Sequence, residues 1–319
     1  MNIENPILSI VVPCYNEADG IALTIEKLQA VLAELTGSAI VDENSFIFLV
    51  DDGSQDNTWE LIKAYHENNE KVRGIRLSRN FGHQQALLAG LHAVSEHVDC
   101  AISIDADLQQ DEKVIPEFIN KFKNGADIVF GIREDRDTDS LLKKMTALAF
   151  YKIMERLGTP LVRNHADYRL TSKKSLEVLK RYGESTVFLR GIFADMGLPS
   201  DLVMFSVKER TAGVSKYTLK KMIAFAVHGI SSFSVAPLRI ISFMGFIIFS
   251  LSALMGFYIL FRSLIIGDTV PGWASTTLPI YFLGGLQMLC LGVAGEYIGN
   301  IYIEAKSRPK YIISERLDG

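Results

Sequence analysis

Short apolar runs alternate with helix-like segments from the start of the chain to about residue 131. The runs cover residues 8–12, 46–50, 72–77, 101–104 and 128–130, and each ends in small or acidic residues. They are rich in Val and Ile and show little alternation, which is typical of parallel strands covered on both faces. The pattern predicts strand–helix–strand units and hence an α/β fold, a mostly parallel, Rossmann-like sheet with helices on both faces.

The segments between the runs have helical periodicity. Between the first two runs an apolar residue recurs every three or four positions, at Ile21, Ile25, Leu28, Leu32 and Leu35. This stripe predicts an amphipathic helix, and further helices are expected to begin near residues 57, 83 and 114. Because an open parallel sheet binds ligands beyond the carboxyl ends of its strands, we expect the chemistry in the residues that follow each run.

Beyond residue 132 the pattern is looser. It predicts helices at 141–157 and around 175–182, and a strand at 202–207. The segment 217–233 then combines Lys220 and Lys221 with apolar residues at helical spacing. A basic amphipathic helix of this kind can lie in a membrane interface, and it can equally be a surface helix of a soluble domain.

Two long apolar stretches near the C-terminus predict membrane-spanning helices. Residues 240–261 and 273–295 comprise 22 and 23 residues without a charged side chain. At about 1.5 Å per residue, each can cross a hydrocarbon core of about 30 Å. Basic residues flank the pair on its outer sides, whereas the loop between the stretches offers only Arg262. By the positive-inside rule, both termini are expected in the cytosol.

These patterns predict four parts of the chain: a cytosolic α/β domain over 1–216, an interfacial segment over 217–236, two transmembrane helices within 237–303 and a cytosolic tail over 304–319. The composition agrees, because 48% hydrophobic residues and a mean hydropathy of +0.18 exceed what a soluble domain needs. The expected location is therefore a multi-pass position in the cell membrane.

Net charge and cysteine content exclude some classes of partner and site. A net charge of −4 gives no basic surface for nucleic acid, which we exclude as a partner. The three cysteines, Cys14, Cys100 and Cys290, form no CxxC pair. They are interpreted as small buried apolar residues in a reducing compartment, not as a disulfide framework or a zinc site.

Polar residues suited to a nucleotide follow the first two apolar runs. The first run leads into Pro13, Tyr15 and Glu17, where an aromatic ring can stack on a base. The second run ends in Asp51 and Asp52, whose oxygens can accept hydrogen bonds from base and ribose. An acidic turn that caps the next helix explains the same residues, and both interpretations can hold at once.

The fourth run ends in a group of hard oxygen ligands. Asp105, Asp107 and Gln109 follow it directly, and such side chains favour Mg²⁺ or Mn²⁺. A divalent cation there would neutralise the diphosphate of a nucleotide sugar as it leaves. Arg133, just after the fifth run, is a candidate for the same charge, although a lone arginine is commonly a solvated surface residue.

Seven motifs in order identify a family resemblance. They are PCYNE, DDGSQDNT, SRNFGHQ, DADLQ, GIR, DYRL and KERTAGVSKY, and the two apolar stretches follow them. Together they resemble the polyprenyl-phosphate glycosyltransferases of glycosyltransferase family 2 over essentially the whole chain. The resemblance implies a GT-A fold, a nucleotide-sugar donor, a divalent cation (Mg²⁺ or Mn²⁺) and inversion at the anomeric carbon.

The resemblance also implies roles for individual residues. The nucleotide would be held by Pro13, Tyr15, Glu17, Asp51 and Asp52. Asp105 would lie near the ribose and share the metal site with Asp107 and Gln109, and Arg133 would contact phosphate. Candidates for the lipid phosphate or the diphosphate are Arg210, Ser215, Lys216 and, by a looser match, Lys143.

The motif DYRL leaves the role of Asp167 open. It is the family's candidate for a general base, and with Asp107 it is one of two residues predicted to be catalytic. A phosphate acceptor, however, has a second pKa near about 6 and is already nucleophilic at cytosolic pH. Asp167 can therefore orient Arg169 or the acceptor instead of accepting a proton.

The predicted function is transfer of a hexose from a nucleotide sugar to undecaprenyl phosphate at the cytosolic membrane face, for modification of cell-envelope glycans. UDP-glucose is the favoured donor, because the chain resembles the bacterial glucosyl branch of the family, and N-acetylglucosamine, mannose, galactose or aminoarabinose donors are alternatives. A processive polymer synthase is disfavoured because its Gln-x-x-Arg-Trp motif is missing. A non-catalytic membrane scaffold is the distant alternative. Relatives suggest a homo-oligomer, either a tetramer or a dimer.

Overall fold

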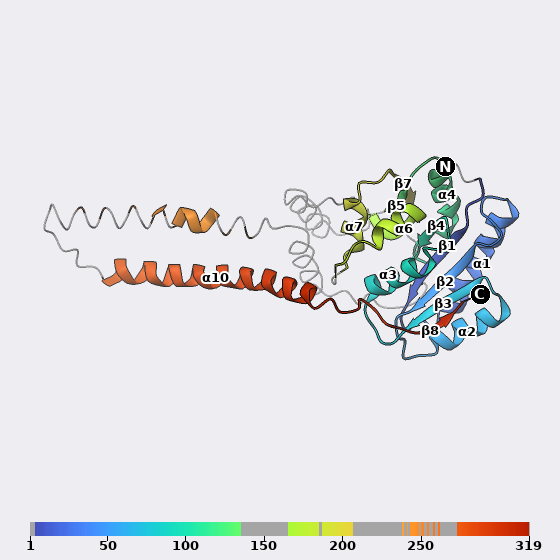
Figure 1. Cartoon of the computed structure of the whole chain (residues 1–319), viewed down its shortest axis with the longest axis horizontal. Coiled ribbons are helices and arrows are strands. Elements are labelled where there is room, and N and C mark those ends of the chain that lie inside the picture. Colours follow the sequence, from blue (N-terminus) through green and yellow to red (C-terminus); the bar gives the residue numbers. More distant parts are fainter. Residues whose placement is uncertain are drawn as a thin grey trace. The chain divides into compact units, whose positions relative to one another are not determined.

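The structure is a computed structural model that describes residues 4–134, 165–184, 187–206 and 273–318, with scattered positions between 238 and 261 (Figure 1). Two compact units make up the chain. One comprises Met1–Leu219 with Arg308–Gly319, and the other comprises Lys220–Ser307. The predicted helix at 141–157 and the amphipathic segment at 217–233 lie outside the described residues.

The first unit contains an eight-stranded sheet in the order β7-β5-β6-β4-β1-β2-β3-β8. The strands are β1 Leu8–Cys14, β2 Phe46–Asp51, β3 Val72–Leu77, β4 Cys100–Ser103, β5 Ile128–Arg133, β6 His165–Ser172, β7 Ser200–Phe205 and β8 Ile313–Leu317. Every residue of β1, β2, β4 and β6 is buried, as expected for strands covered on both faces.

Two strands, β6 and β8, run antiparallel to the others and make the sheet mixed. β1 pairs in parallel with β2 and β4, whereas β6 is antiparallel to both β4 and β5. β6 therefore begins at the edge of the sheet where β1, β2, β4 and β5 end. This arrangement brings the DYRL motif, which lies in β6, to the same edge as the motifs that follow the other strands.

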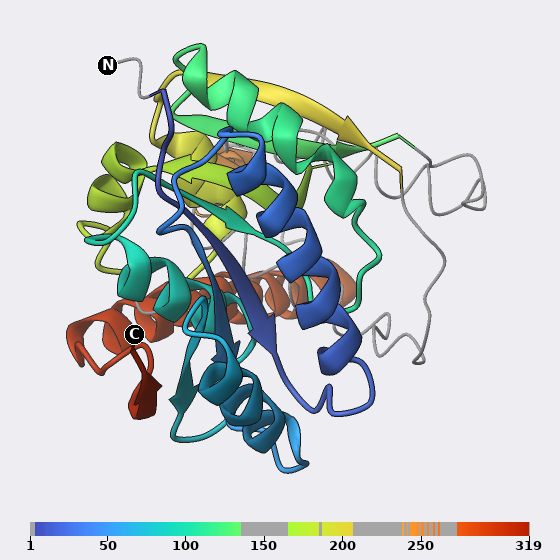
Figure 2. The ribbon, with the colours of Figure 1, turned by 90° about the vertical axis from the view of Figure 1, so that its right-hand side faces the viewer.

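Helices cover both faces of this sheet. The first unit has α1 Ile21–Gly37, α2 Thr58–Asn68, α3 His83–Val94, α4 Ile115–Lys123 with a short 3-10 turn before it (η1, Glu112–Val114), α6 Lys173–Leu179 and α7 Leu189–Asp195. The apolar stripe of α1 packs with Ile10 and Val12 in the main core, and Figure 2 shows α1 in front of the sheet. On the opposite face α3 lies so close that a side chain at Gly90 would meet Val11 and Val50.

The predicted α/β fold with helices on both faces is confirmed, and the arrangement fits a GT-A fold. The five predicted strands match β1 to β5, and the predicted 202–207 strand matches β7 with a shift of two residues. Local pattern did not indicate β6, α7 or β8. The segment set apart as a tail, 304–319, contributes β8, which pairs antiparallel with β3.

The second unit is described mainly by α10, Trp273–Ala305. Within the described residues, one helix is long and apolar enough to cross a membrane, over Phe282–Ala305. Many of its large apolar side chains are exposed, including Phe282, Met288 and Leu291. The other predicted span, 240–261, is described only at scattered positions, so the pair of membrane helices stays a prediction.

Candidate active site

The loops after β1 and β2 are joined by reciprocal hydrogen bonds. The backbone N–H of Asn16 donates to Ser54 Oγ at 2.9 Å, and the Gln55 N–H donates back to Asn16 Oδ1 at 2.9 Å. The Glu17 N–H donates to Thr58 Oγ1, also at 2.9 Å. Asn16 has a φ of 53°, a conformation that Asn tolerates well among residues with a side chain. The motifs PCYNE and DDGSQDNT therefore form one joint surface.

The two acidic residues after β2 are enclosed by the protein. Asp51 is fully buried, and its carboxylate accepts from the Ser54 N–H at 3.3 Å and pairs with Arg76 Nε at 3.3 Å. Asp52 is 2% exposed and accepts from the N–H groups of Phe81 and Gly82 at 2.7 and 2.9 Å. Burial raises the pKa of both carboxyls, and these hydrogen bonds oppose that effect. Both side chains therefore hold the loop backbone in place through hydrogen bonds inside the protein.

Gly53 allows a third loop to join the first two. Its φ is +66°, and a Cβ there would fall 2.7 Å from Cα of Arg79 and 2.8 Å from N of Asn80. Only glycine fits such a close backbone approach without displacing the neighbouring chain. The motif SRNFGHQ thus packs directly against DDGSQDNT and leads into α3.

The loop after β4 holds Asp105 and Asp107 in fixed places. The Gln110 amide binds Asp105 twice: its oxygen accepts from the Asp105 N–H at 3.0 Å, and its Nε2 donates to Asp105 Oδ2 at 2.7 Å. The Gln109 N–H donates to Asp107 Oδ1 at 3.1 Å. Between these residues Leu108 has a φ of 53°, which is costly for a bulky side chain and typical of functional loops.

Asp167 is the centre of a cluster of cations. Arg190 approaches it with two nitrogens, Nε to Oδ1 and Nη2 to Oδ2, both at 3.1 Å. Arg169 Nη2 donates to Oδ1 at 3.2 Å and Gln84 Nε2 to Oδ2 at 3.3 Å. Burial raises the pKa of Asp167, but Arg190, His83 and Arg169 outweigh it and hold this pKa well below its usual range. These partners favour the ionised form of Asp167.

His83, the first residue of α3, lies between two carboxylates. Its Nε2 is 3.7 Å from Asp105 Oδ1 and 3.6 Å from Asp167 Oδ2. Burial lowers the pKa of His83, but both carboxylates favour the charged ring and leave this pKa raised. We expected a helix to begin at His83 but predicted no function for it. The signal was its place in SRNFGHQ, at the start of a helix after a strand.

Arg190, in α7, is the second residue that sequence reasoning missed. Its side chain is 34% exposed although it forms an ion pair with Asp167, so it can also contact a ligand. The backbone N–H of the preceding Leu189 donates to Gln84 Oε1 at 3.1 Å, which ties α7 to α3. Arg190 lies in none of the seven motifs, because its importance comes from side-chain contacts between α7 and β6.

The structure places most predicted site residues at one edge of the sheet. Pro13 is buried in β1, Tyr15 and Glu17 are half-buried in the loop that follows, and Arg133 is exposed at the end of β5. The roles predicted for them remain predictions. Four further candidates, Lys143, Arg210, Ser215 and Lys216, lie outside the described residues.

The predicted divalent cation can be tested against the donor set. Among the described residues no group of three or more His, Cys, Asp or Glu side chains could hold a metal ion. The oxygens of Asp105 and Asp107 nevertheless suit Mg²⁺ or Mn²⁺, and Mg²⁺ usually binds through one or two carboxylates together with substrate phosphates. The side-chain amide of the neighbouring Gln110 is hydrogen-bonded to Asp105 and is therefore not counted among the candidate ligands. The residues therefore fit a cation that a bound diphosphate completes.

Known proteins resemble the chain over almost its full length. A family profile described as Glycosyl transferase family 2 matches residues 9–180. The chain is 50% identical over 313 residues to the uncharacterized glycosyltransferase YkoT of Bacillus subtilis, covering 98% of this chain and 93% of that protein. It is 40% identical over 312 residues to the SfII prophage-derived bactoprenol glucosyl transferase of Shigella flexneri, covering 97% of each. A prophage bactoprenol glucosyl transferase homolog of Escherichia coli is 39% identical over 308 residues, covering 96% of this chain and 98% of that protein.

Proposed function

Because the chain belongs to glycosyltransferase family 2, we propose that it transfers glucose from UDP-glucose to a polyprenyl phosphate at the cytosolic face of a membrane. The acceptor and the sugar are inferred from relatives named bactoprenol glucosyl transferases. The observation that carries the proposal is the cluster of Asp105, His83, Asp167 and Arg190 at the sheet edge beside the joined loops. This cluster combines carboxylates with cations that can face phosphates.

Asp167 in this proposal is a positioning residue and not a general base. Its pKa is held well below its usual range, so it has little affinity for a proton. A phosphate acceptor needs no base, since its second pKa is about 6. The Asp167 carboxylate instead fixes the side chains of Arg190 and His83. Their charges then favour the approach of one anionic substrate to another.

Asp105, Asp107 and Gln109 would hold the divalent cation in this proposal. When bound, such an ion neutralises the charge of the departing diphosphate. The contribution of the chain is the fixed loop: Gln110 holds Asp105, and the Thr24 hydroxyl donates to the Ala106 carbonyl at 2.8 Å. Tyr15 and Glu17 would contact the nucleotide beside it, and Arg133 a phosphate.

The membrane assignment extends the proposal to location. We infer a multi-pass protein of the cell membrane, with both termini in the cytosol, from the two apolar stretches and their basic flanks. A catalytic domain tethered there searches for a lipid phosphate in two dimensions, which raises its effective concentration. Lys143, Arg210, Ser215 and Lys216 are the residues proposed to meet the lipid phosphate.

A transfer assay tests the proposed function. Membranes that contain the full-length protein are incubated with undecaprenyl phosphate, Mg²⁺ or Mn²⁺ and radiolabelled UDP-glucose, and the lipid product is identified by mass spectrometry. We expect a glucosylated lipid phosphate that EDTA suppresses and added metal restores. Product from another nucleotide sugar alone would replace the donor, and no lipid product with any donor would favour the scaffold alternative.

A further inference from the structure

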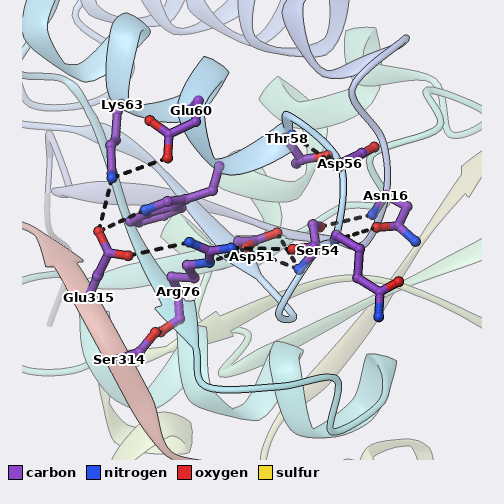
Figure 3. A network of polar contacts seen from close by, with 12 residues as sticks. Asn16, Asp51, Ser54, Asp56, Thr58, Glu60, Lys63, Arg76, Ser314 and Glu315 are labelled. Carbon is purple, nitrogen blue, oxygen red and sulfur yellow. Dashed lines mark hydrogen bonds and ion pairs between the residues drawn. The ribbon is translucent and has the colours of Figure 1, made fainter.

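The C-terminal strand carries a carboxylate that binds three side chains, two from α2 and one from β3 (Figure 3). Glu315, in β8, accepts from Trp59 Nε1 at 3.0 Å and pairs with Lys63 Nζ at 3.0 Å. Its other oxygen, Oε1, accepts from Arg76 Nη1 at 3.4 Å. The hydrogen bonds of Glu315 with Trp59 and Lys63 lower its pKa, so it is ionised at neutral pH.

Arg76 links this carboxylate to the loop after β2. Its Nε is 3.3 Å from the fully buried carboxylate of Asp51, and its Nη2 donates to the Ser54 carbonyl at 3.3 Å. A guanidinium is planar and rigid, so the directions of its three nitrogens are fixed relative to one another. The orientation of Arg76 is therefore set from both sides, by Glu315 and by Asp51.

Ser54 carries the connection into the loop after β1. Its hydroxyl accepts the N–H of Asn16, which follows Tyr15 directly (Figure 3). A displacement of the Ser54 backbone would therefore reach the residues proposed to contact the nucleotide. The path runs from Glu315 through Arg76 and Ser54 to Asn16, and each step is a hydrogen bond or an ion pair.

β8 itself is held by backbone contacts that do not need Glu315. The strand pairs antiparallel with β3, and the Ser78 N–H donates to the Ile312 carbonyl at 2.9 Å. The Ser314 hydroxyl donates to the Arg76 carbonyl at 3.0 Å. The Glu315 side chain is 41% exposed, and ion pairs at that exposure stabilise a fold little. Stabilising the position of β8 therefore does not explain why Glu315 contacts Trp59, Lys63 and Arg76.

We propose that Glu315 is a positioning residue for the nucleotide-binding loop, acting through Arg76 on Asp51 and Ser54. The inference rests on the proposed function, because it assigns the loops after β1 and β2 to the donor nucleotide. It assigns to the segment after α10 a part in donor binding, which the motifs at the front of the chain do not suggest.

The test compares Glu315→Gln with Arg316→Gln in the full-length protein. Gln keeps the shape of Glu315 but loses the charge that orients Arg76. Arg316 is the matched control, since it is the adjacent exposed residue of the same strand and pairs with Asp318 at 3.7 Å. We measure UDP and GDP binding by calorimetry, the KM for each substrate, kcat and Tm.

We expect Glu315→Gln to weaken nucleotide binding and raise the donor KM by about threefold to tenfold, with kcat, lipid KM and Tm near those of the wild type. Arg316→Gln should leave every one of these quantities unchanged. Restoring the carboxylate as Glu315→Asp should recover part of the loss. In the double variant with Arg76→Gln, adding Glu315→Gln should cause no further loss, because the path already ends at Arg76.

Two results overturn the inference. One is a Glu315→Gln protein whose nucleotide affinity equals that of the wild type. The other is a loss of affinity that is fully additive with Arg76→Gln. Failure of the proposed function gives a different pattern, since the wild type then forms no lipid product, while the calorimetric comparison of variants still decides the role of Glu315. A wild type that binds neither UDP nor GDP overturns both.

Discussion

Two acidic loops at the same edge of the sheet use their carboxylates in opposite ways. After β2, Asp51 and Asp52 are buried and bound by Arg76 and by backbone N–H groups. After β4, Asp105 keeps 32% of its side chain exposed and faces His83. The carboxylates of the first loop are used in hydrogen bonds and an ion pair inside the protein, whereas that of Asp105 stays partly exposed, as its proposed role toward a ligand requires.

This contrast shows that an acidic residue after a parallel strand has no fixed role. Both loops satisfy the rule that ligands bind beyond the carboxyl ends of strands. What separates them is the kind of partner: both oxygens of Asp52 accept backbone N–H groups, whereas Asp105 accepts one side-chain amide from Gln110 and lies beside Asp167 and the partly exposed His83. The following variants test this division.

The largest effect is expected at Asp107. Asp107→Ala should lower transfer by about 10³-fold or more, equal to about 4 kcal/mol of transition-state stabilisation, because it removes a proposed metal ligand. Transfer is measured with membranes, and Tm and membrane insertion serve as controls that should not change. An active Asp107→Ala protein would remove the metal assignment.

Asp52 should affect stability first. Asp52→Ala leaves the N–H groups of Phe81 and Gly82 without their acceptor, so we expect a loss of about 3 kcal/mol in the free energy of unfolding. Thermal unfolding of the full-length protein in detergent measures it. The matched variant Asp107→Ala should keep the wild-type Tm. Equal Tm values for the two variants would contradict the contrast between the loops.

Asp167 should have an intermediate effect on activity. We expect Asp167→Asn to lower kcat by about 10-fold to 100-fold, because Arg190 and His83 lose the charge that positions them. The shape of the pH–rate profile should not change, since a carboxylate with so low a pKa does not titrate in the working range. A loss as large as that of Asp107→Ala, with the acidic limb of the profile gone, would restore the general-base role.

The smallest effect is a pH dependence at His83. Its pKa in the folded protein is raised, so its stabilising contribution is complete below the unfolded pKa of about 6.5 and is lost as pH rises through the folded pKa. The difference in Tm between the wild type and His83→Gln should therefore shrink from pH 6 to pH 8.5. A difference that stays constant over this range would show that the two carboxylates do not hold a charged ring.

Much of the fold and part of the site follow from local sequence. The apolar runs predicted β1 to β5 closely, because most residues of each run are buried and the run can be recognised without knowledge of its partner strands. The loops that carry Tyr15, Asp51 and Asp105 could be assigned to one edge for the same reason. Local pattern did not indicate β6, because the polar residues of DYRL, Arg169 among them, belong to a strand that is buried along its whole length.

The sequence by itself determined where strands end and which oxygen-bearing residues follow them. Only the tertiary structure decided which carboxylates are enclosed, that β6 enters antiparallel and brings Asp167 beside His83, and that Glu315 meets Arg76 across 239 positions of the chain. The physical reason is that periodicity is a property of residues close together in the sequence. Desolvation and charge pairing depend on groups that come close in space only when the sheet forms.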